Sequence, residues 1–112
     1  MLVTMKEILD RAKKDNYGVT SIMVDRSSLS YEDNIAQTKE TVKMCRPLNI
    51  SVEAELGHVG QSEDYSSDGS DHFTKPEEVK KFVEETGIDC LAVAIGTAHG
   101  RYHGTPHIDF DL

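Results

Sequence analysis

Three stretches of the chain distribute apolar residues as β-strands do. Residues 50–55 place apolar side chains at every second position, which is the period of a strand with one buried face. Residues 20–25 also have the form of a short strand, with Ile22 and Val24 on one side and Ser21, Met23 and Asp25 on the other. Residues 89–95 are almost continuously apolar, which is typical of a parallel strand covered on both faces. The pattern therefore predicts three strands.

Apolar residues at helical spacing predict three helices that separate or precede these strands. They cover residues 5–16, a stretch from Ser30 to Pro47, and a stretch from Thr74 to Gly87. We expect the hydroxyls of Ser30 and Thr74 to cap the second and third helices. The buried stripe of the third helix is expected to consist of Val79, Phe82 and Val83. Residues 106–112 resemble the start of a further helix.

The order of these elements predicts an α/β fold with a β-α-β-α-β parallel core behind an N-terminal helix. Parallel strands direct their carboxyl ends to one edge of a sheet, and the residues at these ends are Asp25, Glu55 and the loop that bears His99. Two carboxylates and an imidazole at one edge favour metal or acid–base chemistry. Three alternatives remain. In these, residues 50–55 are an edge strand with one solvent-exposed face, His99 is an ordinary loop histidine, and Glu53 is a structural acid.

Length and charge narrow the function classes. With 112 residues the chain is a single domain, residues 1–112, and is shorter than a complete eight-stranded barrel. A net charge of −8 and a pI near 5.0 argue against nucleic-acid binding. The longest apolar run, residues 91–95, is too short to span a membrane, so we expect a cytoplasmic protein. We interpret Cys45 and Cys90 as buried, reduced thiols.

Residues 56–75 form a long segment rich in glycine, serine and aspartate between the second strand and the third helix. Loops of this length in compact domains are more often functional than connective, although disorder is the alternative. The segment carries Glu63, a carboxylate that can exchange protons if burial raises its pKa.

Five motifs, in order, resemble the class II, zinc-dependent ketose-bisphosphate aldolases. They are residues 52–57, 63–64, 74–79, 82–89 and 91–100. The resemblance extends to residues 5–19 and 21–34 and so covers nearly the whole chain. It implies part of a (β/α)8 TIM barrel, and a lyase of carbohydrate metabolism and glycolysis that cleaves fructose or tagatose 1,6-bisphosphate to dihydroxyacetone phosphate and glyceraldehyde 3-phosphate.

The resemblance also implies roles for individual residues. His99 would be a zinc ligand, Glu55 the acid of a second metal position, and Glu63 the loop carboxylate that moves protons, while Asp25 and Glu53 would support them. The positions of close backbone approach to substrate phosphate, or to a monovalent cation such as sodium or potassium, would be Gly57, Gly60 and Gly100. Zinc is the implied cofactor, a sugar bisphosphate the substrate, and a homodimer or homotetramer the assembly.

The sequence also departs from the family. Family members have about two more strands and helices between the equivalents of Val19 and Thr20, with a catalytic aspartate and the first zinc histidine, and a third zinc histidine beyond Leu112. Arg26 and Ser28 replace a usual glycine and histidine. Whether this chain is an enzyme is therefore open: we expect it to be inactive alone, and a non-catalytic half-barrel that associates with itself or a complementary fragment is the alternative.

Overall fold

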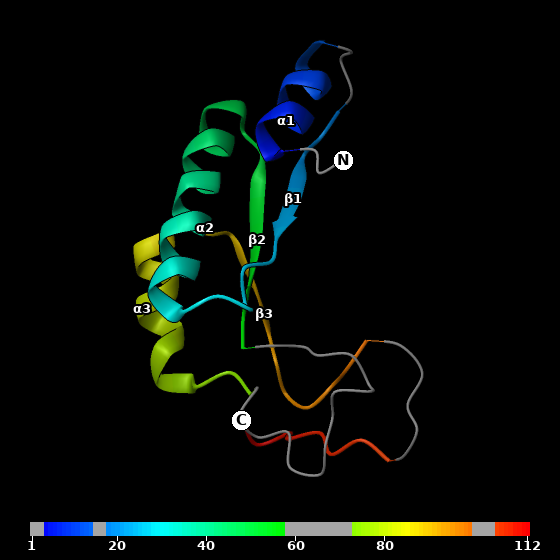
Figure 1. The fold of residues 1–112 in the computed structure, drawn as a ribbon, viewed down its shortest axis with the longest axis vertical. Coiled ribbons are helices and arrows are strands. Elements are labelled where there is room, and N and C mark those ends of the chain that lie inside the picture. The colour runs from blue at the N-terminus through cyan, green and yellow to red at the C-terminus, as the bar shows by residue number, and fades with distance from the viewer. Residues whose placement is uncertain (1–3, 15–17, 58–72, 100–104) are drawn as a thin grey trace.

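The computed structural model describes residues 4–14, 18–57, 73–99 and 105–112. Helices and strands alternate along the chain as the sequence pattern predicts (Figure 1). The elements are α1 (Met5–Lys14), β1 (Ser21–Val24), α2 (Tyr31–Cys45), the 3-10 turn η1 (Arg46–Leu48), β2 (Ser51–Leu56), α3 (Pro76–Thr86) and β3 (Cys90–Val93).

The three strands form one parallel sheet in the order β1-β2-β3. Helices α2 and α3 lie side by side along one face of it (Figure 1). Register partners share a face of a parallel sheet, so Met23 and its partner Glu53 lie on the face that the helices leave open. This arrangement confirms the predicted α/β class and the partial-barrel architecture.

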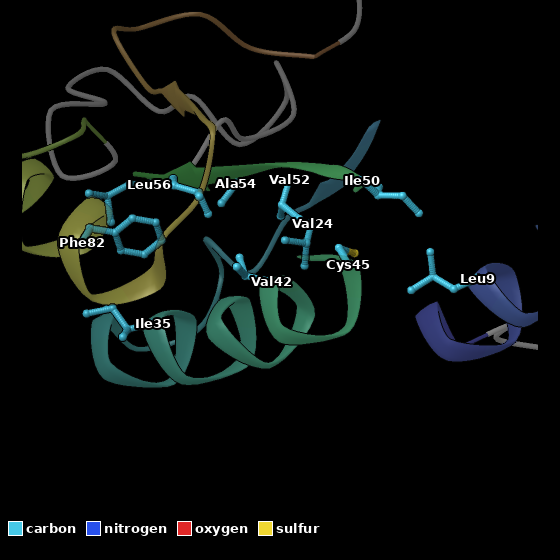
Figure 2. Packing of buried hydrophobic residues seen from close by; sticks show 11 residues of the cluster. Leu9, Val24, Ile35, Val42, Cys45, Ile50, Val52, Ala54, Leu56 and Phe82 are labelled. Carbon is cyan, nitrogen blue, oxygen red and sulfur yellow. The ribbon is translucent and has the colours of Figure 1, made fainter. Parts of the chain in front are cut away.

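The core fills the space between the sheet and the helices (Figure 2). Val52 and Ala54, the alternate residues of β2, are 1% and 0% exposed and point toward α2. Phe82 of α3 is completely buried and is the largest side chain of the core. Strand β2 is central in the described sheet: it pairs with β1 on one side and β3 on the other, and α2 packs on it. The residues that follow its carboxyl end therefore start from a strand that is paired on both sides.

The helix ends follow the predictions with one exception. The Ser30 hydroxyl accepts a hydrogen bond from the amide of Asp33 at 3.1 Å and caps α2, and Gly87 ends α3 with a φ of 71°. The predicted Thr74 cap is wrong: the N-cap of α3 is Lys75, which makes no side-chain capping bond. Thr74 is directed toward the ends of two strands instead.

The predictions for the buried side chains of α3 and β3 and for the last residues of the chain are partly wrong. Val83 is 37% exposed because it lies outside the stripe of α3 that faces α2. The run at β3 is not covered on both faces. Cys90 is the register partner of Glu53 on the face that the helices leave open and is an exposed thiol, and Val93 on this edge strand is 44% exposed. Residues 105–112 form no helix.

An ionic network joins the amino-terminal ends of β2 and β3. The Asp89 carboxylate accepts hydrogen bonds from the Val52 amide at 2.9 Å and from the Arg46 guanidinium at 3.0 Å. The same guanidinium donates to the carbonyl of Gly87. The bond from Val52, and then the bond from Arg46, lower the pKa of Asp89 below its ordinary value of 3.8.

This lowered pKa predicts a pH-dependent effect of Asp89→Asn. A carboxylate with a depressed folded-state pKa stabilises the fold above its ordinary pKa of 3.8, and the stabilisation disappears as the pH falls through the folded-state value. We therefore expect the wild-type chain to exceed the variant in free energy of unfolding at neutral pH and to lose that advantage in acid. Urea denaturation across the acid range measures this, with the exposed Asp10→Asn as the charge-matched control. A difference that persists unchanged below the folded-state pKa would contradict the linkage.

Candidate active site

The carboxyl end of β1 carries a tight polar turn. The Asp25 carboxylate accepts hydrogen bonds from the Ser27 amide at 2.8 Å and from the Ser27 hydroxyl at 2.7 Å. This is an Asx-type turn, in which an aspartate holds the backbone two residues further on. The turn places Ser27 beside the end of the neighbouring strand.

The same serine connects the two predicted acids. Its hydroxyl oxygen lies 3.2 Å from Oε1 of Glu55, a residue that is only 5% exposed. A hydroxyl has one proton and two lone pairs, so Ser27 can bond one carboxylate and reorient toward the other. The predicted convergence of Asp25 and Glu55 at one edge is thus present. Ser27 is not among the predicted site residues, although the Asp-x-Ser spacing at the end of a strand is a usable signal.

Helix α2 holds the backbone beneath Glu55. The side-chain amide of Asn34 donates to the carbonyl oxygen of Glu55 at 2.9 Å, and the Thr38 hydroxyl donates to the Asn34 side-chain oxygen at 3.0 Å. Asn34 and Thr38 are 2% and 0% exposed, so these bonds lie away from solvent. Buried polar side chains in a helix facing a sheet require such partners. This Thr38–Asn34–Glu55 relay fixes the backbone of β2 at Glu55, one residue before the strand ends.

Two glycines bound the rim where the backbone changes direction. Gly57 has a φ of 81° directly after β2, and Gly96 has a φ of 103° after β3. A β-carbon on Gly96 would collide with the carbonyl oxygen of His107 and approach the ring of Phe73 to 3.1 Å. Only glycine allows this close packing, and the turn that it makes leads to His99.

The predicted site residues divide into three groups. Asp25 and Glu55 are brought together, and Glu53 lies half-buried on the same face of β2. His99 is exposed beyond the end of β3, and no cluster of three histidine, cysteine, aspartate or glutamate side chains suited to a metal forms among the described residues. Gly60, Glu63 and Gly100 lie outside the described residues.

The carboxylate and imidazole groups at the rim are of the kind that binds zinc, but too few of them lie together among the described residues. Carboxylate and imidazole are ordinary zinc ligands, and Glu55 and His99 stand at the ends of adjacent strands. A catalytic zinc takes three protein ligands, more than the described residues gather at one point. Further ligands would have to come from outside these residues.

A cavity of about 470 Å³ lies at the same end of the fold, between the starts of α2 and α3. Burial, and then the nearby carboxylate of Glu78, raise the pKa of Tyr31 in its wall, so the phenol keeps its proton and donates to the carbonyl of Glu78 at 2.9 Å. The lining residues are Ser27, Ser28, Leu29, Tyr31, Asn34, Leu56, Gly57, Phe73, Lys75 and Glu78.

Among the described residues, none of the helices has the length and apolar character that a membrane-spanning helix needs.

A parallel sheet with its strands in chain order, helices on one face and acidic residues at its carboxyl rim is the arrangement of a segment of a β/α barrel. The sequence profile described as fructose-bisphosphate aldolase class-II matches residues 3–112. The chain belongs to this family, as its motifs predict.

Solved structures agree with this assignment. The YdjI aldolase from Escherichia coli K12 superimposes with a TM-score of 0.73 at 39% identity, over 97% of this chain and 35% of that chain. A Coccidioides immitis protein assigned as a fructose-1,6-bisphosphate aldolase gives 0.74 at 40% identity, over 94% of this chain and 38% of that one. The fructose-bisphosphate aldolase of Campylobacter jejuni gives 0.61 at 27% identity, over 88% and 30%. The chain therefore spans between 30% and 38% of the length of these relatives.

Proposed function

We propose that this chain forms one wall of an active site for aldol cleavage of a ketose 1,6-bisphosphate, fructose or tagatose, to dihydroxyacetone phosphate and glyceraldehyde 3-phosphate. The observation that carries the proposal is the Asp25–Ser27–Glu55 cluster at the carboxyl rim of the sheet. Active sites of β/α barrels lie at this rim. Family membership supports the reaction class.

The chain's own residues would divide the work of binding and positioning. His99 and Glu55 would be metal ligands, and Asp25, Glu53 and the Ser27 hydroxyl would orient the Glu55 carboxylate. Bound zinc would supply a Lewis acid for the substrate ketone. Glu63 would carry protons, while Gly57, Gly60 and Gly100 would allow substrate phosphate, or a sodium or potassium ion, to approach the backbone.

We further propose that the 112-residue chain by itself does not catalyse this cleavage and that activity requires a complete barrel. The described residues gather no three metal donors, which supports this proposal. A complete barrel of this family would work in the cytoplasm, as a homodimer or homotetramer. The proposal that the 112-residue chain is inactive by itself would be contradicted if the purified chain released dihydroxyacetone phosphate from a ketose bisphosphate and a chelator stopped the release.

A chimera tests the proposed role of Glu55. Residues 18–112 would replace the matching segment of the Coccidioides immitis protein, and release of dihydroxyacetone phosphate from fructose or tagatose bisphosphate would be followed with zinc and with a chelator. We expect the chimera to cleave, and Glu55→Gln to lower kcat by at least about 10- to 100-fold, because loss of a metal ligand costs no less than loss of a partner that orients a ligand.

The matched control is Glu77→Gln, which removes a carboxylate from the exposed first turn of α3. It should leave kcat unchanged, and the unmodified host must cleave under the same conditions. Equal activity of the Glu55→Gln and Glu77→Gln chimeras would reject the proposed role of Glu55.

The second candidate function is that of a non-catalytic half-barrel. The exposed side chains of Met23 on the open face and Val93 on the edge strand favour association, because apolar residues on an uncovered sheet attract a partner. A monodisperse dimer that takes up no zinc would support this candidate over the first.

A further inference from the structure

Thr74 has an environment that its position before α3 does not explain. It is 3% exposed, although it directly precedes the exposed N-cap Lys75. Its hydroxyl caps no helix. A buried hydroxyl that leaves its helix must have other partners, and these partners show what it does.

Those partners belong to two different strands. The Thr74 hydroxyl donates to the carbonyl oxygen of Leu56, the last residue of β2, and accepts from the amide of Ala94 at 2.7 Å, directly after β3. The Thr74 amide also donates to the carbonyl of Ala94 at 2.9 Å. Leu56 and Val93 are the last register partners of the two strands. Thr74 therefore bridges β2 and β3 at the point where their direct pairing ends.

The groups that Thr74 joins lie next to the candidate site residues. Leu56 follows Glu55 and precedes the turn at Gly57, while Ala94 leads into the turn at Gly96 that carries His99. The Asn34 side chain donates to the carbonyl of Glu55, the residue before Leu56. The last two carbonyls of β2 are thus each bound by a side chain, one from α2 and one from Thr74.

We propose that Thr74 is a positioning residue that sets the separation between the carboxyl ends of β2 and β3, and through them the relative placement of Glu55 and the 96–99 turn. The catalytic part of this proposal, the placement of Glu55, rests on the proposed function. The structural part, the separation of the two strand ends, rests only on the three hydrogen bonds of Thr74.

The chemistry of the hydroxyl gives discriminating variants. Thr74→Val keeps the volume and shape but removes the hydroxyl, so the Leu56 carbonyl and the Ala94 amide both lose this partner. Thr74→Ser keeps the hydroxyl and removes a methyl group. Thr74→Cys is a further variant, in which a thiol forms longer and weaker bonds.

The test has two independent readouts. In the 112-residue chain, amide hydrogen exchange at Ala94 should be faster in Thr74→Val than in wild type and close to wild type in Thr74→Ser. In the chimera, Thr74→Val should lower kcat about 10- to 100-fold with little change in KM, because a displacement of about 1 Å at a catalytic group has this cost. Thr74→Ser should restore kcat, and Thr74→Cys should lie between the two.

The outcomes separate this inference from the proposed function. Wild-type kcat in the Thr74→Val chimera, or equal losses in Thr74→Ser and Thr74→Val, would overturn the positioning role. Unchanged exchange at Ala94 in Thr74→Val would overturn the bridge itself. If the wild-type chimera cleaves no sugar bisphosphate, the proposed function fails, and the exchange comparison still decides whether Thr74 sets the strand spacing. If Thr74→Val does not fold, wild-type exchange and kcat in Thr74→Cys would overturn the proposal.

Discussion

Phe82→Ala should lower the free energy of unfolding by about 3–5 kcal/mol, the cost of emptying a completely buried aromatic site. The ring lies between α3 and the sheet and meets Tyr31 of α2 at a centroid distance of 6.1 Å. Its removal leaves a cavity that both helices border, so the walls cannot close it without moving relative to β2. Urea denaturation followed by circular dichroism measures the loss.

Val83→Ala is the matched control, because Val83 is adjacent on the same helix and 37% exposed. We expect a change well below that of Phe82→Ala, since little apolar surface returns to water. Equal destabilisation by the two substitutions would show that α3 packs through a different face from the one described.

Asn34→Leu should destabilise the chain by about 2–4 kcal/mol even though it places an apolar residue in an apolar setting. The Glu55 carbonyl and the Thr38 hydroxyl would each lose the partner that Asn34 provides, in a region shielded from water. Unpaired buried polar groups cost more than the packing of leucine contributes. Thermal and urea denaturation both report the change.

Lys39→Leu makes the same kind of replacement at an exposed position of α2 and should change stability by less than about 0.5 kcal/mol. The double variant Asn34→Leu with Thr38→Val should recover part of the loss, because it removes the unpaired hydroxyl along with its partner. An Asn34→Leu variant as stable as Lys39→Leu would mean that water replaces the relay.

The fold was largely predictable because its signals are local. Alternation in β2 and the stripe of α2 each predict which residues are buried, and Val52, Ala54 and Val42 are in the core. Edge exposure was not predictable in the same way. The residues of β3 are as apolar as those of a central strand, and only the packed structure shows that Cys90 and Val93 are exposed.

For the candidate site, the sequence predicted which strands end in acidic residues. Because parallel strands end at one rim, Asp25 and Glu55 were expected together, and they are. The groups that hold them were missed, since Ser27, Asn34 and Thr74 are ordinary polar residues whose partners are up to 28 positions away in the chain. Local sequence assigned Thr74 to a helix cap because a hydroxyl before Lys-Pro-Glu has that form.

The sequence alone determined the types of the three helices and three strands, the parallel direction of the strands and the family, although not the non-helical form of residues 105–112, because periodicity and motif order are written along the chain. Tertiary structure decided the rest: which strand is central, which acid is buried, and which hydroxyl bridges β2 to β3. The physical reason is that a hydrogen bond depends on distance in space. Thr74 lies 18 residues from Leu56 and 20 from Ala94 in sequence, and only the packed sheet brings the three together.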